Sequence, residues 1–547
     1  MLPNLLIFGL LRRPINEADS IHRGYIKFYW RQCRTIRARL YVLKALLLSL
    51  PSIGKDIKPW LKKNGRITAA LGFKSTFRQK AEMYYLAFLY SIDAENYYLQ
   101  EFYRIDGLRR ARQFVNKGAI KQGVYNLLRD YSQQVNKMQE SCSLGKKVEF
   151  TDYCQKKDIP VVPVLMEINP DKSKNLEHSN LNNNLLLPQE NLFCKPNQDN
   201  EGEGAEVWFW QGDNSYKSQS GVQLSAVDLY KRLHNYAKKH FSKSILVQPL
   251  VLPHKKLSIF RKQATPTIRV ISYIDPNTGD IIPDCAMLRF SWQEDSVVDN
   301  ASAGGIVAPI DINKGVLGSA TGSGEEFITK RWNYLPDNNT KINGFLLPYW
   351  PDTIKLVIHA HNYFKQRLVV GWDIMITDDG PVILEGNSQP GLCYMQKAHL
   401  KPLGETSLGV AIAYYVKKAE NYLYSGVFKE GFTGDIEDID FYKGSNFKRL
   451  LSTYLIKNKQ AVYLIITGKV QGVFYRKWLK KQAGKRRLNG WVRNLDDGRV
   501  EAVIKGRAVD VEDLIRLCRV GPDNAIVDNI EIYHYKNNVK GSFEIIK

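Results

Sequence analysis

Apolar residues recur with helical spacing through the first 130 residues of the chain, and turn residues are few there. The segment YYLAFLYSIDAENYYLQEFYRI illustrates the pattern, and Arg, Lys and Tyr are frequent around it. We therefore predict a basic helical region at residues 1–130. Interleaved basic and aromatic residues can bind RNA, but amphipathic helices that pack on a neighbouring domain have the same pattern, and we favour packing.

Farther along, the helical spacing gives way to short apolar runs separated by turn signals and helical stretches. ILVQPLVL, TIRVISYI and RLVVGWDIMI are examples, and together they predict a mixed α/β domain at 131–425. Gly, acidic and aromatic residues without a clear period indicate a linker at 426–456 before a last domain at 457–547. The fold class that we expect is α+β or α/β, with several domains.

Composition and charge narrow the class of protein. A chain of 547 residues with 44% hydrophobic residues is long enough for more than one packed core. The formal charge of +23 indicates an acidic partner, and charge alone leaves nucleic acid, an anionic membrane surface and a phosphorylated small molecule open. Seven cysteines without a C-x-x-C pair indicate reduced, intracellular thiols rather than a zinc site or a disulfide framework.

The chain contains no run of about 20 apolar residues, the length that crosses a bilayer. The best candidate, LYVLKALLLSL at 40–50, is short and is broken by Lys44. The first residues place their arginines after the apolar run, unlike a secretory signal. We expect a cytoplasmic protein, with peripheral association at the inner face of the membrane as the remaining alternative.

The segment AVYLIITGKVQGVFYRKW predicts a buried strand, a glycine-containing turn, and a helix that begins near Phe474. Successive backbone N–H groups at such a helix start point to one place and suit a phosphate. These groups belong to Gln471, Gly472, Val473 and Phe474. Arg476 adds a cationic fork. Two strands joined by a DDG turn follow, and Asn494 ends the first of them, where its amide can hold a water molecule.

Three motifs of this last domain resemble the acylphosphatase family. GKVQGVFYR is similar to the phosphate loop of that family, NGWVRNLDDGRVEAV to its second motif, and GPDNAIVDNIEI to its late strand. The resemblance implies a ferredoxin-like βαββαβ sandwich that hydrolyses acyl phosphates without a metal. It also implies that Arg476 holds the acyl phosphate and stabilises charge on the phosphoryl oxygens, while Asn494 orients the attacking water.

Lysine and oxygen-bearing side chains at strand positions predict a nucleotide site in the central domain. Lys195 ends the apolar run LFCKP and directly precedes a glycine-containing loop, a pattern that can hold phosphates. In VGWDIMITDDGPVILEGN, Asp373 lies on one strand, and Glu385 and Asn387 lie two residues apart on the next. Because residues i and i+2 share a face, and a hairpin brings Asp373 to that face, three oxygen ligands converge in a way that suits Mg²⁺.

The region from about 130 to 425 resembles the ATP-grasp superfamily. TPTIRVISYI, VVDNASAGGIVAPID, LLPYW and VGWDIMITDDGPVILEGNSQPG resemble its branch associated with sugar transfer and surface polysaccharides. The resemblance implies ATP clamped between two α+β subdomains, with Mg²⁺ on the three oxygen ligands named above. It further implies Lys195 and Lys147 on the phosphates, Arg269 near the triphosphate, Gln248 and Leu250 at the adenine hinge, and Asn300 near the transferred phosphate or the acyl substrate.

Two features depart from that superfamily. The hinge is VQPLV where many relatives carry a glutamate, and the glycine loop is unusually acidic for a phosphate cradle.

A separate candidate is IHAHNYF, whose His359 and His361 could suggest a metal site. Residues two apart in a helix do not face each other, so we interpret both as core or surface histidines.

Together the two resemblances imply a shared substrate. ATP-grasp ligases phosphorylate a carboxylate and pass the acyl phosphate to an amine, and acylphosphatases hydrolyse intermediates of that class. We expect small-molecule carboxylates, acyl phosphates and ATP as partners, with a role in surface polysaccharide modification, and we expect no nucleic acid. Two alternatives remain: a ligase or kinase whose last domain only binds anions, and a non-enzymatic basic scaffold for polysaccharide or membrane enzymes. The complete metal trio argues against the scaffold.

Overall fold

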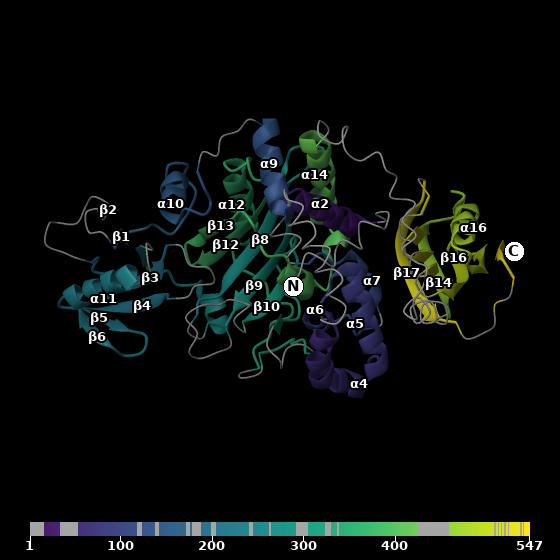
Figure 1. The fold of residues 1–547 in the computed structure, drawn as a ribbon, viewed down its shortest axis with the longest axis horizontal. Coiled ribbons are helices and arrows are strands. Elements are labelled where there is room, and N and C mark those ends of the chain that lie inside the picture. The colour runs from purple at the N-terminus through teal and green to yellow at the C-terminus, as the bar shows by residue number, and fades with distance from the viewer. Residues whose placement is uncertain are drawn as a thin grey trace. The chain divides into compact units, whose positions relative to one another are not determined.

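The computed structural model describes most of the chain between residues 16 and 546. The described residues are 16–32, 53–104, 106–116, 123–136, 142–170, 176–177, 187–197, 204–239, 244–261, 264–291, 305–322, 330–335, 339–424, 459–507, 510–511, 514–515, 517–518, 521–522, 524–535, 539 and 541–546. They form two compact units, one within Met1–Thr433 and one within Gly434–Lys547 (Figure 1). The predicted linker at 426–456 lies outside the described residues.

Helices make up the first part of the N-terminal unit, as the apolar spacing predicts. They are α2 Glu17–Gln32, the π-helix η1 Leu61–Gly65, α4 Arg66–Ala70, α5 Thr76–Tyr90, α6 Ala94–Leu99, α7 Gly107–Gln113 and α9 Tyr125–Asn136. Polar side chains mark two of the helix starts. The Ser75 hydroxyl accepts from the backbone N–H of Arg78 at α5, and the Asp93 carboxylate accepts from that of Asn96 at α6.

These helices share a core with the rest of their unit. α2 and α9 pack on α14 (Ser407–Tyr424). Ile21, Tyr25 and Leu128 are buried in one cluster with Ile412 of α14 and Ile271 of the sheet behind it. The interpretation that the basic helices pack on a neighbouring domain is therefore confirmed for α2 and α9.

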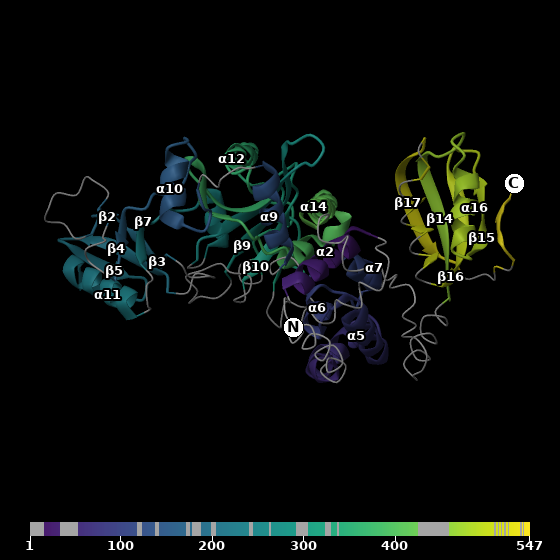
Figure 2. The same cartoon turned by 45° about the horizontal axis from the view of Figure 1, so that its top comes forward.

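A seven-stranded sheet carries the predicted phosphate lysine. Its strand order is β2-β1-β7-β3-β4-β5-β6. The strands are β1 Met166–Ile168, β2 Leu176–Glu177, β3 Leu192–Pro196, β4 Glu206–Gly212, β5 Ser215–Ser218, β6 Gln223–Ser225 and β7 Ile245–Pro249. α11 (Ala226–Lys239) covers one face of this sheet (Figure 2) and packs Leu229 and Leu233 against Leu192 and Val247.

A second sheet, with six strands, lies between two helical layers (Figure 1). Its order is β11-β10-β9-β8-β12-β13, and its strands are β8 Thr267–Ile274, β9 Ile281–Phe290, β10 Ile306–Ile310, β11 Thr321–Gly322, β12 Val369–Thr377 and β13 Gly380–Asn387. The other helices of this region are α10 Lys147–Gln155, η4 Lys255–Phe260, α12 Trp350–Asn362, α13 Cys393–His399 and η7 Leu403–Glu405. Val270 packs in a cluster with Val357 of α12, whereas the next residue, Ile271, packs in the cluster of α2, α9 and α14. Because both faces are covered, β8 and β12 are nearly continuous apolar runs.

The C-terminal unit is one sheet with helices on one face. Its strand order is β17-β14-β16-β15-β18. Its elements are β14 Lys459–Lys469, α16 Tyr475–Lys485, β15 Asn489–Asn494, β16 Val500–Arg507, β17 Ile526–His534 and β18 Phe543–Ile545. The first four strands in chain order follow the predicted βαββαβ plan, and helical residues between 510 and 518 add Val511, Leu514 and Cys518 to the core. β18, parallel to β15, was not predicted, because three residues carry too little pattern.

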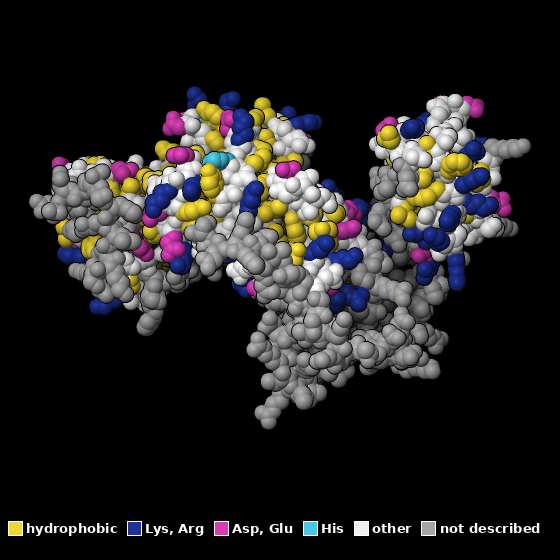
Figure 3. Space-filling model, turned by 90° about the horizontal axis from the view of Figure 1, so that it is seen from above, with side chains coloured by type: hydrophobic (Ala, Val, Ile, Leu, Met, Phe, Trp, Pro, Cys, Tyr) yellow, Lys and Arg dark blue, Asp and Glu magenta, His cyan; other side chains and the backbone are white. Residues whose placement is uncertain are grey.

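The surface is mixed in charge. On the face shown in Figure 3, Lys and Arg side chains are interspersed with acidic and apolar ones, and on the C-terminal unit they gather on one part of that face. Among the residues that the structure describes, no helix combines the length and the apolar character that a membrane span needs.

The imidazole of His361 is fully buried beneath the six-stranded sheet. Its Nε2–H donates to the carbonyl of Arg367 at 2.8 Å, and its Nδ1 accepts from the Ser272 hydroxyl at 2.7 Å. That hydroxyl oxygen in turn accepts from the Trp372 indole N–H at 2.9 Å. Burial lowers the pKa of His361 to about 4. The interpretation of His361 as a core histidine is confirmed, and His359 is an exposed surface histidine.

We predict that the N-terminal unit loses stability as the pH falls from about 7.5 to about 4.5. The ordinary pKa of histidine is 6.5 and that of folded His361 is about 4, so the unfolded chain binds more protons in this range. The expected loss is about 2 to 3 kcal/mol of unfolding free energy, measured by urea denaturation with tryptophan fluorescence. His361→Asn should remove this part of the pH dependence, and His359→Asn should keep it. Equal pH dependence in the two variants would contradict the assignment.

Candidate functional site

The β12–β13 hairpin brings together the three predicted metal ligands. Asp373 pairs directly with Glu385, and Gly371 pairs with Asn387. The Asn387 amide lies 3.3 Å from Glu385 Oε1 and 3.5 Å from Asp373 Oδ2. When the Asn387 amide is turned over, its oxygen faces the two carboxylates instead of its nitrogen. Two carboxylates and one amide oxygen form a donor set of the kind that holds Mg²⁺. The residues present therefore fit the predicted ion.

Two arginines hold the buried carboxylate of Asp373. Arg269, on the adjacent strand β8, donates to both of its oxygens, with Nη2 at 2.5 Å from Oδ2. Arg289, on β9, lies 3.3 Å from Oδ2 and also donates to the Thr267 hydroxyl at 2.7 Å. Burial by itself would raise the pKa of Asp373, but the two guanidiniums outweigh it and hold that pKa below the ordinary value. Asp373 is therefore charged at neutral pH.

Arg289 was missed by the sequence analysis. Its only signal in the sequence is a single arginine within the apolar run CAMLRF. In the structure this run pairs with β8, and Arg289 lies opposite Thr267. An isolated arginine in a strand does not show which neighbouring strand it faces. Its position beside Asp373 and Arg269 makes it part of the candidate site.

One of the two predicted phosphate lysines, Lys195, is within electrostatic range of the other, Lys147, and of the carboxylates of Glu385 and Asp373. Lys195 lies on β3, and Lys147 is the first residue of α10. The pKa of Lys195 is lowered to about 8, mainly by burial and then by the charge of Lys147, while Glu385 and Asp373 act in the opposite direction. Lys195 of the seven-stranded sheet is thus influenced both by Lys147 of α10 and by the carboxylates of the six-stranded sheet. That arrangement suits a polyphosphate and its cation.

The predicted hinge residues lie where the chain leaves the seven-stranded sheet. Gln248, near the end of β7, donates its amide hydrogens to the carbonyls of Val162 at 3.2 Å and Pro163 at 3.3 Å. The backbone N–H of Leu250 donates to the carbonyl of Asn191 at 2.7 Å. The Leu250 N–H is therefore already used within the protein, and the role of the predicted hinge stays a prediction.

One predicted site residue of the central domain, Asn300, lies outside the described residues. Gly305, which follows Asn300 farther along the chain, begins the described segment that leads into β10. Gly204, in the predicted glycine loop, has a φ of +77°, a value that glycine adopts at little cost. The role of the loop itself stays a prediction.

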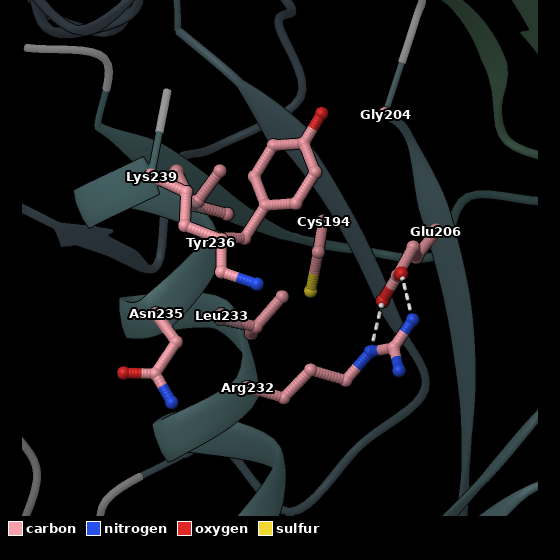
Figure 4. Close-up of a pocket in the computed structure, with 9 residues that line it drawn as sticks. Cys194, Gly204, Glu206, Arg232, Leu233, Asn235, Tyr236 and Lys239 are labelled. Atoms are coloured by element: carbon pink, nitrogen blue, oxygen red, sulfur yellow. Dashed lines mark hydrogen bonds and ion pairs between the residues drawn. The ribbon is translucent and has the colours of Figure 1, made fainter. Parts of the chain in front are cut away.

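A cavity of about 320 Å³ lies between α11 and strands β3, β4 and β7 (Figure 4). An ion pair between Arg232 and Glu206 spans its wall, and Tyr236 and Lys239 project from α11 beside it. Cys194 lines this cavity, and its neighbour Lys195 points to the opposite face of the sheet because strand side chains alternate. The cavity is therefore separate from the predicted nucleotide site.

In the C-terminal unit, the loop between β14 and α16 contains two residues with left-handed backbone. Gly472 has a φ of +74° and Phe474, the residue before α16, has a φ of +62°. Alternation of left-handed and ordinary backbone turns successive N–H groups toward one point. The Gln471 side chain ties this loop to the β15–β16 turn by donating to the carbonyls of Leu495 at 2.7 Å and Arg499 at 2.8 Å.

The two residues predicted to be catalytic are Asn494 in β15 and Arg476 in α16. Asn494 is the last residue of β15, directly before Leu495, and its Oδ1 is buried with no hydrogen-bond partner among the described residues. A buried acceptor without a partner costs about 1 to 3 kcal/mol, so it marks a position for a water molecule or ligand. Arg476 is partly exposed in the first turn of α16 and, within the described part of the chain, forms no ion pair. Its guanidinium is available to an anion in the loop.

Comparisons with known proteins agree with both resemblances. The family model "Sugar-transfer associated ATP-grasp" matches residues 126–406, and the family model "Acylphosphatase" matches residues 462–545. The acylphosphatase of Syntrophus aciditrophicus is 51% identical over 71 residues, which are 13% of this chain and 74% of that protein. The acylphosphatase of Haloarcula marismortui is 41% identical over 83 residues, which are 15% of this chain and 91% of that protein.

Solved structures are similar to each part of the chain. An acylphosphatase from Coxiella burnetii has 33% identity over 16% of this chain and 95% of its own, with a TM-score of 0.16. D-alanyl-alanine synthetase A from Vibrio cholerae has 13% identity over 50% of this chain and 64% of its own, with a TM-score of 0.28.

We predict that substitution of Glu385 weakens ATP binding alone, whereas substitution of Asp373 also lowers the stability of the protein. Glu385→Gln removes a charge from a partly exposed position, so ATP binding in the presence of Mg²⁺ should weaken about tenfold with little change in stability. Asp373→Asn leaves Arg269 and Arg289 without their buried counter-charge and should also lower the unfolding free energy by about 3 kcal/mol.

Titration calorimetry with ATP and Mg²⁺ measures the first effect, and urea denaturation measures the second. Glu149→Gln, on an exposed face of α10, is the matched control and should change neither. Equal losses of stability in the Glu385 and Asp373 variants would contradict the distinction.

Proposed function

Because this chain belongs to the sugar-transfer associated ATP-grasp family and ends in an acylphosphatase domain, we propose that it both makes and destroys acyl phosphates. In this proposal the C-terminal unit hydrolyses acyl phosphates to carboxylate and inorganic phosphate. The N-terminal unit uses ATP to phosphorylate a carboxylate and transfers the acyl group to an amine. The observation that carries the first activity is the buried Oδ1 of Asn494, which has no hydrogen-bond partner within the described part of the chain.

The proposed hydrolysis needs only groups of the C-terminal unit. The loop N–H groups and the Arg476 guanidinium bind the phosphoryl oxygens and stabilise their charge in the transition state. Asn494 Oδ1 accepts a hydrogen bond from water and holds the water oxygen toward phosphorus. The new bond joins water oxygen to phosphorus, and the bond between phosphorus and the acyl oxygen breaks. The leaving group departs as a carboxylate, whose low basicity removes the need for an acid.

For the N-terminal unit, we propose that Lys195 and Lys147 bind the ATP phosphates and that Asp373, Glu385 and Asn387 hold Mg²⁺. When bound, Mg²⁺ neutralises phosphate oxygens and aligns the γ-phosphoryl group. Arg269 and Arg289 hold the Asp373 carboxylate in its charged form, facing the other two ligands. The terminal phosphoryl group then passes from ATP to a carboxylate oxygen, which gives ADP and an acyl phosphate.

The fusion of the two domains supports a coupled role. We propose that the C-terminal unit hydrolyses acyl phosphates that the N-terminal unit forms and then loses before an amine attacks them. The sugar-transfer association of the ATP-grasp family makes a carboxylate in surface polysaccharide modification the favoured substrate. Small-molecule carboxylates, ATP and acyl phosphates are the partners that this proposal requires.

Arg476→Ala and Asn494→Ala should each lower kcat/KM for benzoyl phosphate by about 100-fold or more, because each removes a contact to the phosphoryl group or the water. The full chain is assayed in the presence of EDTA, since the proposed step uses no metal. Arg486→Ala is the matched control, because Arg486 lies at the other end of α16 and donates to the Gln482 carbonyl at 3.1 Å. Wild-type rates in both site variants would refute the proposed hydrolysis.

Coupling predicts an effect of the C-terminal site on ATP turnover. Carboxylate-dependent ADP release should fall by about threefold or more in Arg476→Ala, because acyl phosphate then accumulates and occupies the site that makes it. ADP release is measured without an amine acceptor, over a panel of small carboxylic acids. Turnover identical to that of the wild-type chain would show that the two activities are independent.

A further inference from the structure

Two neighbouring residues of α9 hold the segment that directly follows Asn387, the last of the three candidate metal ligands. The Tyr125 hydroxyl donates to the carbonyl of Pro390 at 2.9 Å. The side-chain amide of Gln389 donates to Asn126 Oδ1 at 3.2 Å. Tyr125 is 5% exposed and Pro390 is buried, whereas Gln389 is exposed. Because water competes least with a buried hydrogen bond, the contact of Tyr125 is the stronger of the two.

Pro390 in turn lies against β12, on the face of the strand that bears Asp373. Trp372 and the alternate residues on either side of it pack in the cluster of α12. Strand side chains alternate, so Gly371 and Asp373 point to the opposite face, where α9 packs. A Cβ on Gly371 would lie only 2.6 Å from the Cβ of Pro390. Pro390 therefore rests directly on Gly371, which is the residue that pairs with Asn387.

The electrostatics agree with this placement of Tyr125. Burial is the main cause that raises the pKa of Tyr125 well above its ordinary value, and the charge of Arg269 acts in the opposite direction. Arg269 is the residue that holds the Asp373 carboxylate. Since the neighbours of Arg269 on β8, Ile268 and Val270, pack toward α12, its side chain also points to the face that α9 covers. Tyr125 stays protonated at neutral pH and can donate its hydrogen bond there.

We propose that Tyr125 is a positioning residue of the candidate Mg²⁺ site. Its hydrogen bond to Pro390 fixes the end of β13, and thereby the amide of Asn387 relative to the carboxylates of Glu385 and Asp373. The inference rests on the proposed ATP-dependent function of the N-terminal unit. It gives the helical region before the ATP-grasp match a part in that site, because the match begins at residue 126.

The size of the expected effect follows from what the hydroxyl does. Without it the carbonyl of Pro390 is left buried with no donor from Tyr125, so the segment after Asn387 is held less firmly. Loss of a group that orients a metal ligand lowers metal affinity by about 10- to 100-fold. Binding of ATP without the metal does not use Asn387 and should not change.

The test measures the dissociation constant of ATP for the full chain by titration calorimetry, once with excess MgCl₂ and once with EDTA. The affinity with Mg²⁺ divided by that without it reports the contribution of the metal. In Tyr125→Phe this ratio should fall by about tenfold, while the constant in EDTA stays at the wild-type value. Tyr131→Phe is the matched control, because it removes a hydroxyl from the same helix near Tyr415 of α14. It should change neither constant.

A double variant shows whether Tyr125 acts through Asn387. Asn387→Ala removes the ligand itself and should lower the ratio at least as much as Tyr125→Phe does. Adding Tyr125→Phe to that variant should lower the ratio little further, because two residues that act through one contact are not additive. A further tenfold fall would show that Tyr125 acts independently of Asn387, which overturns the inference.

The remaining outcomes separate the positioning role from the proposed function. A wild-type ratio in Tyr125→Phe, or equal weakening of ATP binding with and without Mg²⁺, overturns the positioning role and leaves the nucleotide site in place. A wild-type chain whose affinity for ATP does not depend on Mg²⁺ overturns the metal site and the inference together.

Discussion

The buried carboxylate of Asp373, held between Arg269 and Arg289, is the interaction on which the N-terminal unit depends most. A charge at that depth is tolerated only with partners of opposite sign. Those partners come from β8 and β9, and Asp373 comes from β12, so the cluster joins three consecutive strands of the six-stranded sheet. The same carboxylate faces Glu385 on the fourth strand, β13. Strand register and the candidate metal site are therefore set by the same group of side chains.

The parts of the site that could be predicted are those fixed by local pattern. The hairpin around the DDG turn follows from two apolar runs with a short connection. The pairing of Asp373 with Glu385 does not, because a bulge between Asp373 and Ile374 shifts the register and a regular ladder would place Leu384 opposite Asp373. The phosphate loop is equally local, because its glycines and the helix start lie in one segment. The hairpin, and the strand, turn and helix around the phosphate loop, were therefore predicted from local pattern.

Residues whose role depends on distant packing could not be obtained from pattern. Arg289 lies beside Asp373 only because β8 and β9 pair in a register that includes a bulge. The hydrogen bond from the Leu250 N–H to the Asn191 carbonyl joins residues 59 positions apart, and no periodicity of the sequence predicts it. The proximity of Lys147 to Lys195 followed from resemblance alone, since it requires α10 to pack near the seven-stranded sheet. Long-range register and packing carry information that a single sequence shows only indirectly.

The hydrogen bonds from the Gln471 side chain to the carbonyls of Leu495 and Arg499 bear on how this domain can be joined to other proteins. They fasten the anion loop to the hairpin that bears Asn494, so they hold the two halves of the C-terminal site together. The geometry then depends on a single stretch of chain from Gly468 to Arg499 and on the sheet beneath it. A site built in this way is portable: recombination can attach it to an unrelated protein, and it needs no adjustment from its new neighbour.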